Sequence, residues 1–260
     1  MTAALDALAA RFDRLADAGR VVDLWWRDDD AVEATPALDR LLGLAEAARW
    51  PVCLAVIPAL ARPSLPERLA GRDDVTVLVH GWTHANHAPP HEKTAEFGAH
   101  RAVAEMDREM RDGRDRLASA FGERALPVFV PPWNRIAPAA AAALPRLGYR
   151  ALSCFGGAEH GGPLARLDAH LDPVDWRGGR SLARPDALTA QLDRAIDRGV
   201  TRIGFLTHHL MFDDVLWSFV EGVAALAADH PATRPIGLSQ PLIDRLAGGA
   251  ADASLLGAAA

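Results

Sequence analysis

The sequence predicts an α/β protein built on a parallel sheet, because short apolar strands alternate with amphipathic helices through about seven or eight rounds. Half of the 260 residues are hydrophobic, and no linker or internal repeat divides the chain, so we expect a single domain over residues 1–247. Closure of the sheet into a barrel is the arrangement that we favour at this length. An open doubly wound sheet is the alternative, although no Gly-rich phosphate loop follows any strand.

Strands are assigned to short runs of β-branched and other apolar residues that are bounded by polar residues, Gly or Pro. In chain order they are 21–26, 52–57, 75–79, 127–130, 149–155, 171–176, 202–207 and 235–238. Helices are assigned where apolar residues recur every three or four positions, and Thr35 and Pro36 mark one start as N-cap and first helical residue. They cover 3–19, 36–49, 65–70, 97–121, 137–147, 188–196, 215–228 and a short segment after 238. From 248 to 260 an Ala/Gly/Ser-rich stretch has little to bury, so we expect a disordered tail.

The charge and cysteine content argue against several classes of protein. The formal net charge is −6 and no Lys/Arg stripe appears, so no nucleic-acid partner is expected, and no apolar run is long enough to span a membrane. Residues 1–20 carry charges throughout, unlike a signal peptide, so we expect a cytoplasmic protein. Cys53 and Cys154 lie in apolar stretches and are expected to be buried thiols rather than a disulfide.

Two histidines follow the strand predicted over 75–79. His80 stands where this strand ends, and His84 comes four residues later. In α/β proteins with parallel strands, chemistry gathers at the carboxyl ends of the strands. Neutral imidazoles are the commonest ligands of zinc and similar divalent metals. We therefore expect His80 and His84 to hold a metal ion, with a third ligand supplied from elsewhere in the chain.

Polar and aromatic side chains also follow the other predicted strands, so one pocket at this edge of the sheet would collect them. In chain order they are Asp28–Asp30, His80 and His84, Pro131–Trp133, Asp172 with Asp175 and Trp176, and His208. A hydrolytic zinc-type centre needs three protein ligands and an open position for water. Two histidines and one carboxylate meet that need. A second carboxylate can then take a proton from water, and a histidine opposite can protonate the leaving group.

Structural roles are open for some of these residues. Trp133 and Trp176 fit packing at the rim of a barrel as well as stacking on sugar rings. Asp172 and Asp175 flank a proline, as turn residues often do. A solvated turn is the least attractive interpretation of Asp28–Asp30, because three adjacent carboxylates repel one another without a cation.

In these motifs the sequence resembles the polysaccharide deacetylases, the NodB-homology family of metal-dependent carbohydrate esterases, over about residues 21–240. Asp28–Asp30, followed by Thr35-Pro36, is similar to the family's Thr-Phe-Asp-Asp-Gly motif, and His80 with His84 fits His-Ser/Thr-x-x-His. Val130–Asn134 looks like Arg-Pro-Pro-Tyr-Gly, Asp172–Trp176 matches Asp-x-x-Asp-Trp, and Leu206–His208 fits Leu-x-His.

The resemblance implies a distorted (β/α)7–8 barrel of the polysaccharide deacetylase type, and it implies roles for individual residues. Asp28 would be the general base, His208 the general acid, and Asp29, His80 and His84 the ligands of a divalent metal, zinc before cobalt or nickel. Pro132, Trp133, Asp175 and Trp176 would contact the substrate. The alternative register, shifted by one residue, makes Asp29 the base and Asp30 the ligand.

One departure from the family concerns the arginine that precedes Pro-Pro and orients the base, because Val130 stands there in this chain. Arg27 and Arg135 are both candidates to replace it, and the sequence does not decide between them. Such departures indicate a divergent member whose substrate need not be a polymer.

These observations predict a metal-dependent hydrolase that removes an acetyl group from an N-acetylated sugar or related amide, and so acts on carbon–nitrogen bonds other than peptide bonds. A small molecule or an oligosaccharide would be its substrate. Two alternatives stay open: a non-catalytic carbohydrate-binding or regulatory domain on a decayed deacetylase scaffold, and hydrolysis of a non-acetyl C–N bond. The sequence gives neither the identity of the substrate nor the oligomeric state.

Overall fold

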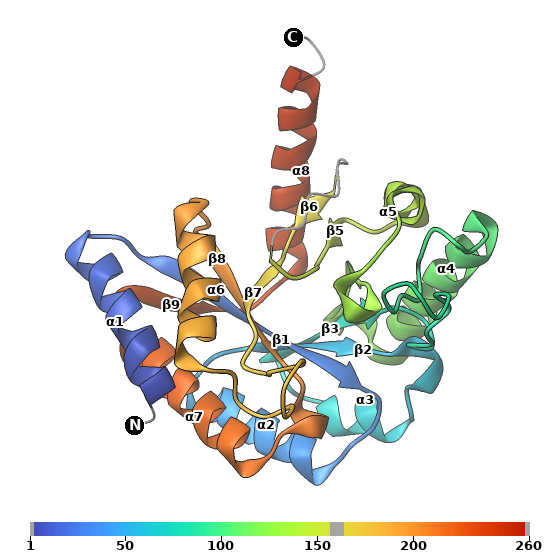
Figure 1. Cartoon of the computed structure of the whole chain (residues 1–260). Coiled ribbons are helices and arrows are strands. Elements are labelled where there is room, and N and C mark those ends of the chain that lie inside the picture. Colours follow the sequence, from blue (N-terminus) through green and yellow to red (C-terminus); the bar gives the residue numbers. More distant parts are fainter. Residues whose placement is uncertain (1–2, 157–163, 258–260) are drawn as a thin grey trace.

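The computed structural model of the protein describes residues 3–156 and 164–257, which form a curled, parallel sheet surrounded by helices (Figure 1). The strands are β1 (Val22–Ala31), β2 (Val52–Val56), β3 (Val75–His80), β4 (Ala125–Val130), β5 (Ala151–Leu152), β6 (Ala165–Arg166), β7 (Ala169–Leu171), β8 (Arg202–Thr207) and β9 (Thr233–Ile236). Their order in the sheet is β6-β5-β4-β3-β2-β1-β8-β7, and β9 pairs with the first half of β1.

The two ends of this strand order are consecutive parts of the chain, because only residues 167–168 separate β6 from β7. Phe155, which follows β5, forms a parallel bridge with Ala169 of β7. The Ala169 N–H donates to the Cys154 carbonyl and the Gly156 N–H donates to the Ala169 carbonyl, both at 2.8 Å. The interrupted strand 165–171 therefore lies between β5 and β8 and joins the ends of the sheet into the distorted barrel that the sequence predicts.

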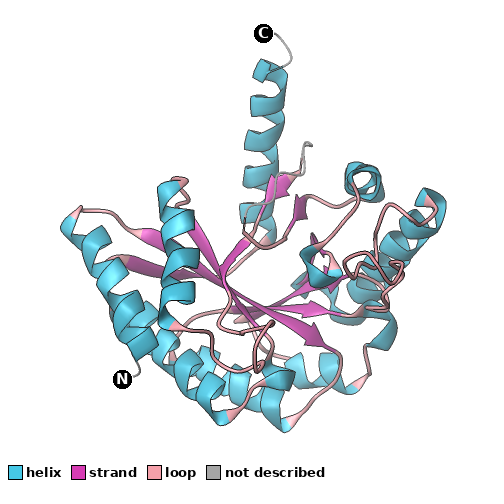
Figure 2. Ribbon diagram, in the orientation of Figure 1, coloured by secondary structure: helices cyan, strands magenta, loops and turns pink. Residues whose placement is uncertain are grey.

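Helices cover the outside of the curled sheet (Figure 2). These outer helices are α1 (Ala3–Asp17), α2 (Pro36–Ala47), α3 (Ser64–Leu69), α4 (Val103–Phe121), α5 (Pro138–Ala143), α6 (Pro185–Asp197) and α7 (Asp214–Asp229), whereas α8 (Gln240–Gly257) begins against the inner face. Thr35 caps α2 as predicted, since its hydroxyl accepts the Leu38 N–H at 3.0 Å. Gly148, with a φ of 86°, follows the α5 segment in the left-handed conformation expected of a C-cap.

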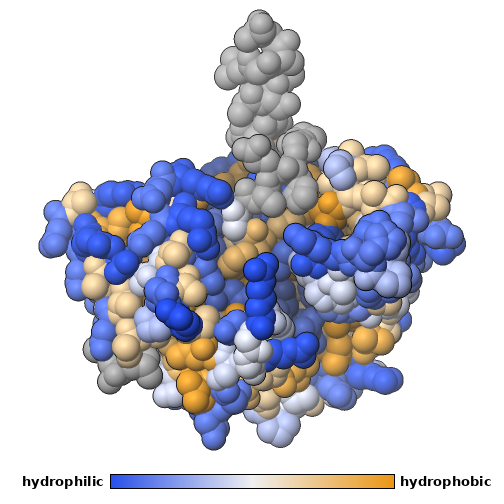
Figure 3. Space-filling model, in the orientation of Figure 1, coloured by the Kyte–Doolittle hydropathy of each residue, from blue (hydrophilic) through white to orange (hydrophobic). Residues whose placement is uncertain are grey.

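Alternation along the strands gives the sheet two buried faces. The outer face, under the helices, packs residues such as Trp26, Leu54 and Val77. The inner face packs Trp25, Leu78 and other residues against the segment that begins α8. Figure 3 shows one face of the molecule, on which hydrophilic residues are mixed with apolar patches. Side chains two positions apart on one strand share a face, and this alternation decides which polar residues meet at the site.

Several predicted boundaries are wrong. The strand predicted over 21–26 continues through the three aspartates to Ala31. Helix α4 begins at Val103, not Phe97, which instead bridges to Ile136. The strand predicted over 171–176 lies earlier, in β6 and β7, where the Ala165–Leu171 sequence has no β-branched run to reveal it.

Helix α8 is longer than the short helix predicted after 238, and its second half overlaps the predicted tail, 248–260. Figure 1 shows this part of α8 projecting from the rest of the molecule. Residues 258–260 of the predicted tail lie outside the described residues. Among the helices of the described chain, none combines the length and the hydrophobicity that crossing a bilayer requires.

Candidate metal centre and active site

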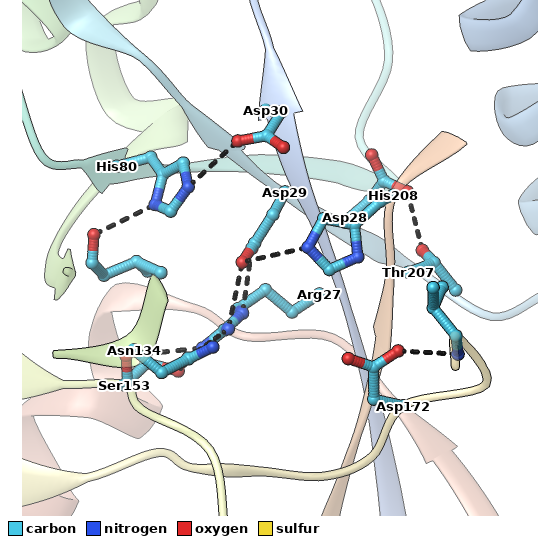
Figure 4. A network of polar contacts seen from close by, with 12 residues as sticks. Arg27, Asp28, Asp29, Asp30, His80, Asn134, Ser153, Asp172, Thr207 and His208 are labelled. Atoms are coloured by element: carbon cyan, nitrogen blue, oxygen red, sulfur yellow. Dashed lines mark hydrogen bonds and ion pairs between the residues drawn. The ribbon is translucent and has the colours of Figure 1, made fainter. Parts of the chain in front are cut away.

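Asp30, His80 and His84 come together at the carboxyl ends of β1 and β3. Each offers one ligand atom, and these atoms all lie within 4.8 Å of one another. The Asp30 Oδ1 atom is 3.2 Å from Nε2 of His80 and 3.4 Å from Nε2 of His84. Two donors at about 2.0–2.1 Å from a tetrahedral zinc ion are roughly 3.3 Å apart, so the spacing fits such an ion. Figure 4 shows the Asp30 carboxylate facing the His80 ring.

The tautomer of His80 also fits a metal ligand. Its Nδ1 lies 3.0 Å from the Val130 carbonyl oxygen, which can only accept a hydrogen bond, so Nδ1 carries the proton. The Nε2 lone pair of the neutral ring then faces the Asp30 oxygen, and two acceptors at that distance require a cation or a second proton between them. Metal-bound histidines commonly have this arrangement, with the far nitrogen donating to a backbone carbonyl.

The charges of the centre favour a positive charge between the carboxylate and the rings. Burial alone would raise the pKa of Asp30, but its hydrogen bond to His80 and the nearby imidazoles hold that pKa well below its usual range. Burial alone would lower the pKa of His80, but Asp29 and Asp30 outweigh it and the pKa is raised. Burial, with the charge of His80, lowers the pKa of His84 and favours its neutral, ligating form.

A β-bulge brings Asp30 into this group. β1 pairs regularly with β2 up to Asp29, the register shifts between Asp29 and Ala31, and Asp30 is the extra residue, with a φ of 73°. In an unbroken strand Asp30 would share the face of Asp28, away from the histidines. The bulge turns it towards them.

Asp29 lies on the inner face of β1 and is held by Arg27, two residues before it. The guanidinium makes two contacts with the carboxylate, Nε to Oδ1 at 2.9 Å and Nη2 to Oδ2 at 3.0 Å. Arg27 is fully buried and also donates to the Ser153 hydroxyl and to the Asn134 side-chain oxygen, each at 2.7 Å. Arg135 instead donates to the Thr94 carbonyl and hydroxyl. Of the two candidates to replace the arginine absent at Val130, the structure therefore places Arg27 beside a carboxylate.

His208 enters the site from the end of β8. Its Nε2 lies 3.9 Å from Oδ2 of Asp29. The Trp176 ring meets the imidazole edge-on, with ring centroids 4.8 Å apart, and its indole N–H donates to Oδ2 of Asp172 at 2.7 Å. Burial raises the pKa of Asp172, and the nearby His208 opposes that shift. Asp29 and His208 thus lie near each other, beside the group of Asp30, His80 and His84.

The structure groups the carboxylates one residue along from the assignments that the resemblance implies. The carboxylate beside His80 and His84 is that of Asp30 rather than Asp29, and Asp29 takes the arginine-held position expected of Asp28. Asp28 points to the outer face, where its carboxylate is fully buried and contacts Thr207 and His209. The geometry favours the alternative register, because the bulge adds one residue that sequence spacing does not reveal.

The four residues predicted to contact substrate are placed differently. Trp133 lies against the His84 ring, with centroids 4.4 Å apart, and Trp176 is 46% exposed beside His208, so both border the site. Pro132 is buried under the loop that carries His84. Asp175 accepts the backbone N–H groups of Arg177 and Gly178, the turn role named above as its alternative.

Sequence reasoning missed three supporting residues: Ser153, Asn134 and Glu96. Asn134 has a φ of 56° and stands where the family motif has glycine, and asparagine tolerates this backbone conformation better than most residues, so a signal existed. Buried Glu96 accepts the backbone N–H groups of Trp82 and Thr83 at 3.1 and 2.7 Å and so fixes the His84 loop. From the sequence, Glu96 is only a polar residue near a predicted helix, and nothing indicates its contact with the His84 loop.

Comparison with solved structures places the chain in a structural class: it has the fold of the polysaccharide deacetylases, the family 4 carbohydrate esterases. It is similar to a protein from Mycobacterium smegmatis described as a polysaccharide deacetylase, with a TM-score of 0.67 and 14% identity over 89% of this chain and 92% of that one. Neither the scan of protein-family models nor the search of curated proteins found a match.

Two further solved structures share the fold. The peptidoglycan deacetylase of Bacillus subtilis has a TM-score of 0.56 and 13% identity, covering 90% of this chain and 96% of that one. A family 4 pseudoenzyme from Bacillus anthracis has a TM-score of 0.52 and 12% identity, covering 79% of this chain and 60% of that one. The common fold thus occurs both in enzymes and in a protein without that activity.

Proposed function

We propose that the protein is a metal-dependent hydrolase that removes the acetyl group from an N-acetylated sugar or a related small amide. Asp30, His80 and His84 would hold the metal, Asp29 would be the general base, and His208 the general acid. The observation that carries the proposal is the convergence of a three-ligand centre with an arginine-held carboxylate and an imidazole at one edge of the sheet. The deacetylases among its structural neighbours support the choice of an acetamide.

When bound, a divalent cation supplies Lewis-acid polarisation of a carbonyl and makes water more acidic. Asp29 would accept the proton of the attacking water, and its two contacts with Arg27 would aim the carboxylate. His208 would give its proton to the departing nitrogen. The Asp172 carboxylate, linked to the His208 ring through Trp176, would stabilise the imidazolium.

The two tryptophans at the edge of the site are suited to an extended sugar substrate. Trp133 borders the metal ligands and Trp176 borders the acid, so the reacting amide would lie between two aromatic side chains. Aromatic faces pack well against the apolar faces of sugar rings. A single N-acetyl sugar or a short oligosaccharide fits this proposal.

The test combines metal analysis with a screen for acetate release from small N-acetyl sugars and chitin oligosaccharides. We expect about one divalent metal per chain, and activity that a chelator removes and added zinc or cobalt restores. His80→Ala and His84→Ala should lose both metal and activity. His91→Ala, at a histidine whose side chain is 81% exposed, is the matched control and should lose neither. Full metal content in both His80→Ala and His84→Ala would refute the ligand set.

A second candidate is a non-catalytic carbohydrate-binding or regulatory protein, which the pseudoenzyme among the structural neighbours favours. The contact of Arg27 with Asp29 weakens it, because an arginine lies beside the proposed base even though Val130 stands where the family motif has arginine. Metal binding with sugar binding but without release of acetate would support this candidate. Release of another acyl group, or of ammonia, would instead indicate a non-acetyl C–N substrate.

A further inference from the structure

Asp28 carries a buried carboxylate that the proposed reaction does not use. It is 0% exposed and lies on the outer face of β1, between Arg27 and Asp29. Its Oδ2 accepts the Thr207 hydroxyl at 2.6 Å and the His209 backbone N–H at 3.1 Å, and its Oδ1 lies 2.5 Å from Nδ1 of His209. All three contacts join one carboxylate to one short segment, 207–209.

This segment is the place where the chain leaves the sheet to enter the site. Asp28 and Thr207 are partners in the parallel register of β1 and β8, so β8 ends directly beside Asp28. The Thr207 hydroxyl also accepts the Trp26 indole N–H at 2.8 Å, which fixes the direction of its own proton towards Asp28. His208 lies between the two residues that Asp28 holds.

The His208 ring depends on this backbone anchoring. Its Nδ1 is buried and has no hydrogen-bond partner among the residues that the structure describes. Its Nε2 is 3.9 Å from Asp29, beyond hydrogen-bonding distance, and the Trp176 ring packs against its side. Hydrogen bonds therefore do not orient the ring, so its place relative to Asp29 follows from where residues 207–209 are held.

We propose that Asp28, Thr207 and His209 form a clamp that positions His208 against Asp29. The inference rests on the proposed function only in naming His208 as the acid. Asp28 and Asp29 are adjacent on β1, so the strand that carries the base, Asp29, also holds the acid, His208, through Asp28. The distance between the base and the acid is therefore set by one peptide unit of β1 and by the clamp. The clamp residues are positioning residues, since they contact neither substrate nor metal in this arrangement.

The clamp is tested first without any substrate, by crystal structures of Thr207→Val and His209→Leu. We expect the His208 ring to move away from its place beside Asp29 or to occupy several rotamers, while the Asp30, His80 and His84 group stays in place. His209→Asn retains a donor where Nδ1 lies and should restore the ring position. An unmoved His208 in Thr207→Val and His209→Leu would overturn the proposal. If His209→Leu does not fold, Thr207→Val with His209→Asn decides the question.

Kinetics on the best acetamide substrate then measure the consequence. Misplacement by about 1 Å can cost roughly 100-fold in rate, so kcat should fall about 10- to 100-fold in Thr207→Val, with KM and metal content unchanged. Thr189→Val, which removes a buried hydroxyl that donates to carbonyls of its own helix, α6, is the control and should keep the wild-type kcat. Inactivity of the wild type would count against the proposed function and leave the crystallographic result to judge the clamp. A kcat loss matched by equal loss of metal would overturn it, because the damage would then be general.

Discussion

Three adjacent aspartates occupy three different environments, and the differences arise from the backbone of β1. Asp28 faces outward and contacts Thr207 and His209, Asp29 faces inward and contacts Arg27, and the bulge turns Asp30 towards His80 and His84. Sequence reasoning singled out this group of carboxylates and predicted a cation beside it. It could not divide their roles, because the spacing to Thr35-Pro36 does not reveal a residue that bulges out of the strand.

The first prediction at this scale separates the proposed general base, Asp29, from the proposed metal ligand, Asp30. Asp29→Asn keeps the size of the side chain and removes its charge, so turnover should fall by about 10²–10⁴ while metal content stays at the wild-type level. Asp30→Asn, one residue along, should lower metal content as well. Metal analysis and steady-state kinetics on both variants are the measurement, and loss of metal from Asp29→Asn alone would restore the original register.

The second prediction concerns the buried ion pair. In Arg27→Met the Asp29 carboxylate would be left buried without its partner, so the free energy of unfolding should fall by about 3–5 kcal/mol. The double variant Arg27→Met/Asp29→Leu removes both charges and should regain most of that loss. Urea unfolding in the presence of a chelator is the measurement. Equal destabilisation by the single and double changes would mean that Arg27 acts through packing rather than charge.

At the scale of elements, the loop after β3 is shaped by a close approach between backbone and side chains. Gly81 has a φ of 59°, and a Cβ there would lie 2.1 Å from Glu96 Oε2 and 2.6 Å from Pro132. The same Glu96 carboxylate holds the loop through Trp82 and Thr83. Only glycine allows the chain to turn from β3 towards His84 beneath this contact.

Gly81→Ala should therefore weaken metal binding by displacing His84, and lower stability by about 1–3 kcal/mol through backbone strain. Gly71→Ala is the matched control, because Gly71 has a φ of 76° but nothing within 4 Å of its added Cβ. It should lower stability less and leave metal affinity unchanged. Thermal unfolding and metal titration compare the two variants. Equal metal affinities of Gly81→Ala and Gly71→Ala would contradict the role of the loop in placing His84.

Elements with a strong local pattern were predictable, and those without one were not. The apolar runs of β2, β3 and β8 and the capped start of α2 were found from composition and spacing. β6 and β7 contain two and three residues and are recognisable only from their partners in the sheet. Ser153 was missed for a similar reason, since its role depends on a contact with Arg27, which is distant in sequence.

For the whole molecule, the two buried layers account for the cysteines. Cys53 and Cys154 are free and buried, as predicted, and burial raises the pKa of each thiol to about 11. At pH 8 only about one thiol in a thousand would then be ionised and reactive. A thiol reagent should label neither cysteine in the native protein and both after unfolding without reductant. Rapid native labelling would show that one of these layers opens readily.

The shortest ladders of the sheet join β4 to β5, β5 to β6 and β7 to β8, with two residue pairs in each. Short ladders have few hydrogen bonds to break, so we expect the free energy of local opening of the barrel to be lowest there. Asp172 and Trp176 follow β7, whereas the proposed metal ligands come from the ends of β1 and β3 on the opposite, well-paired side. The side of the site formed by Asp172 and Trp176 would then move to accommodate larger substrates. The side formed by β1 and β3 would stay rigid and keep the reacting groups in place.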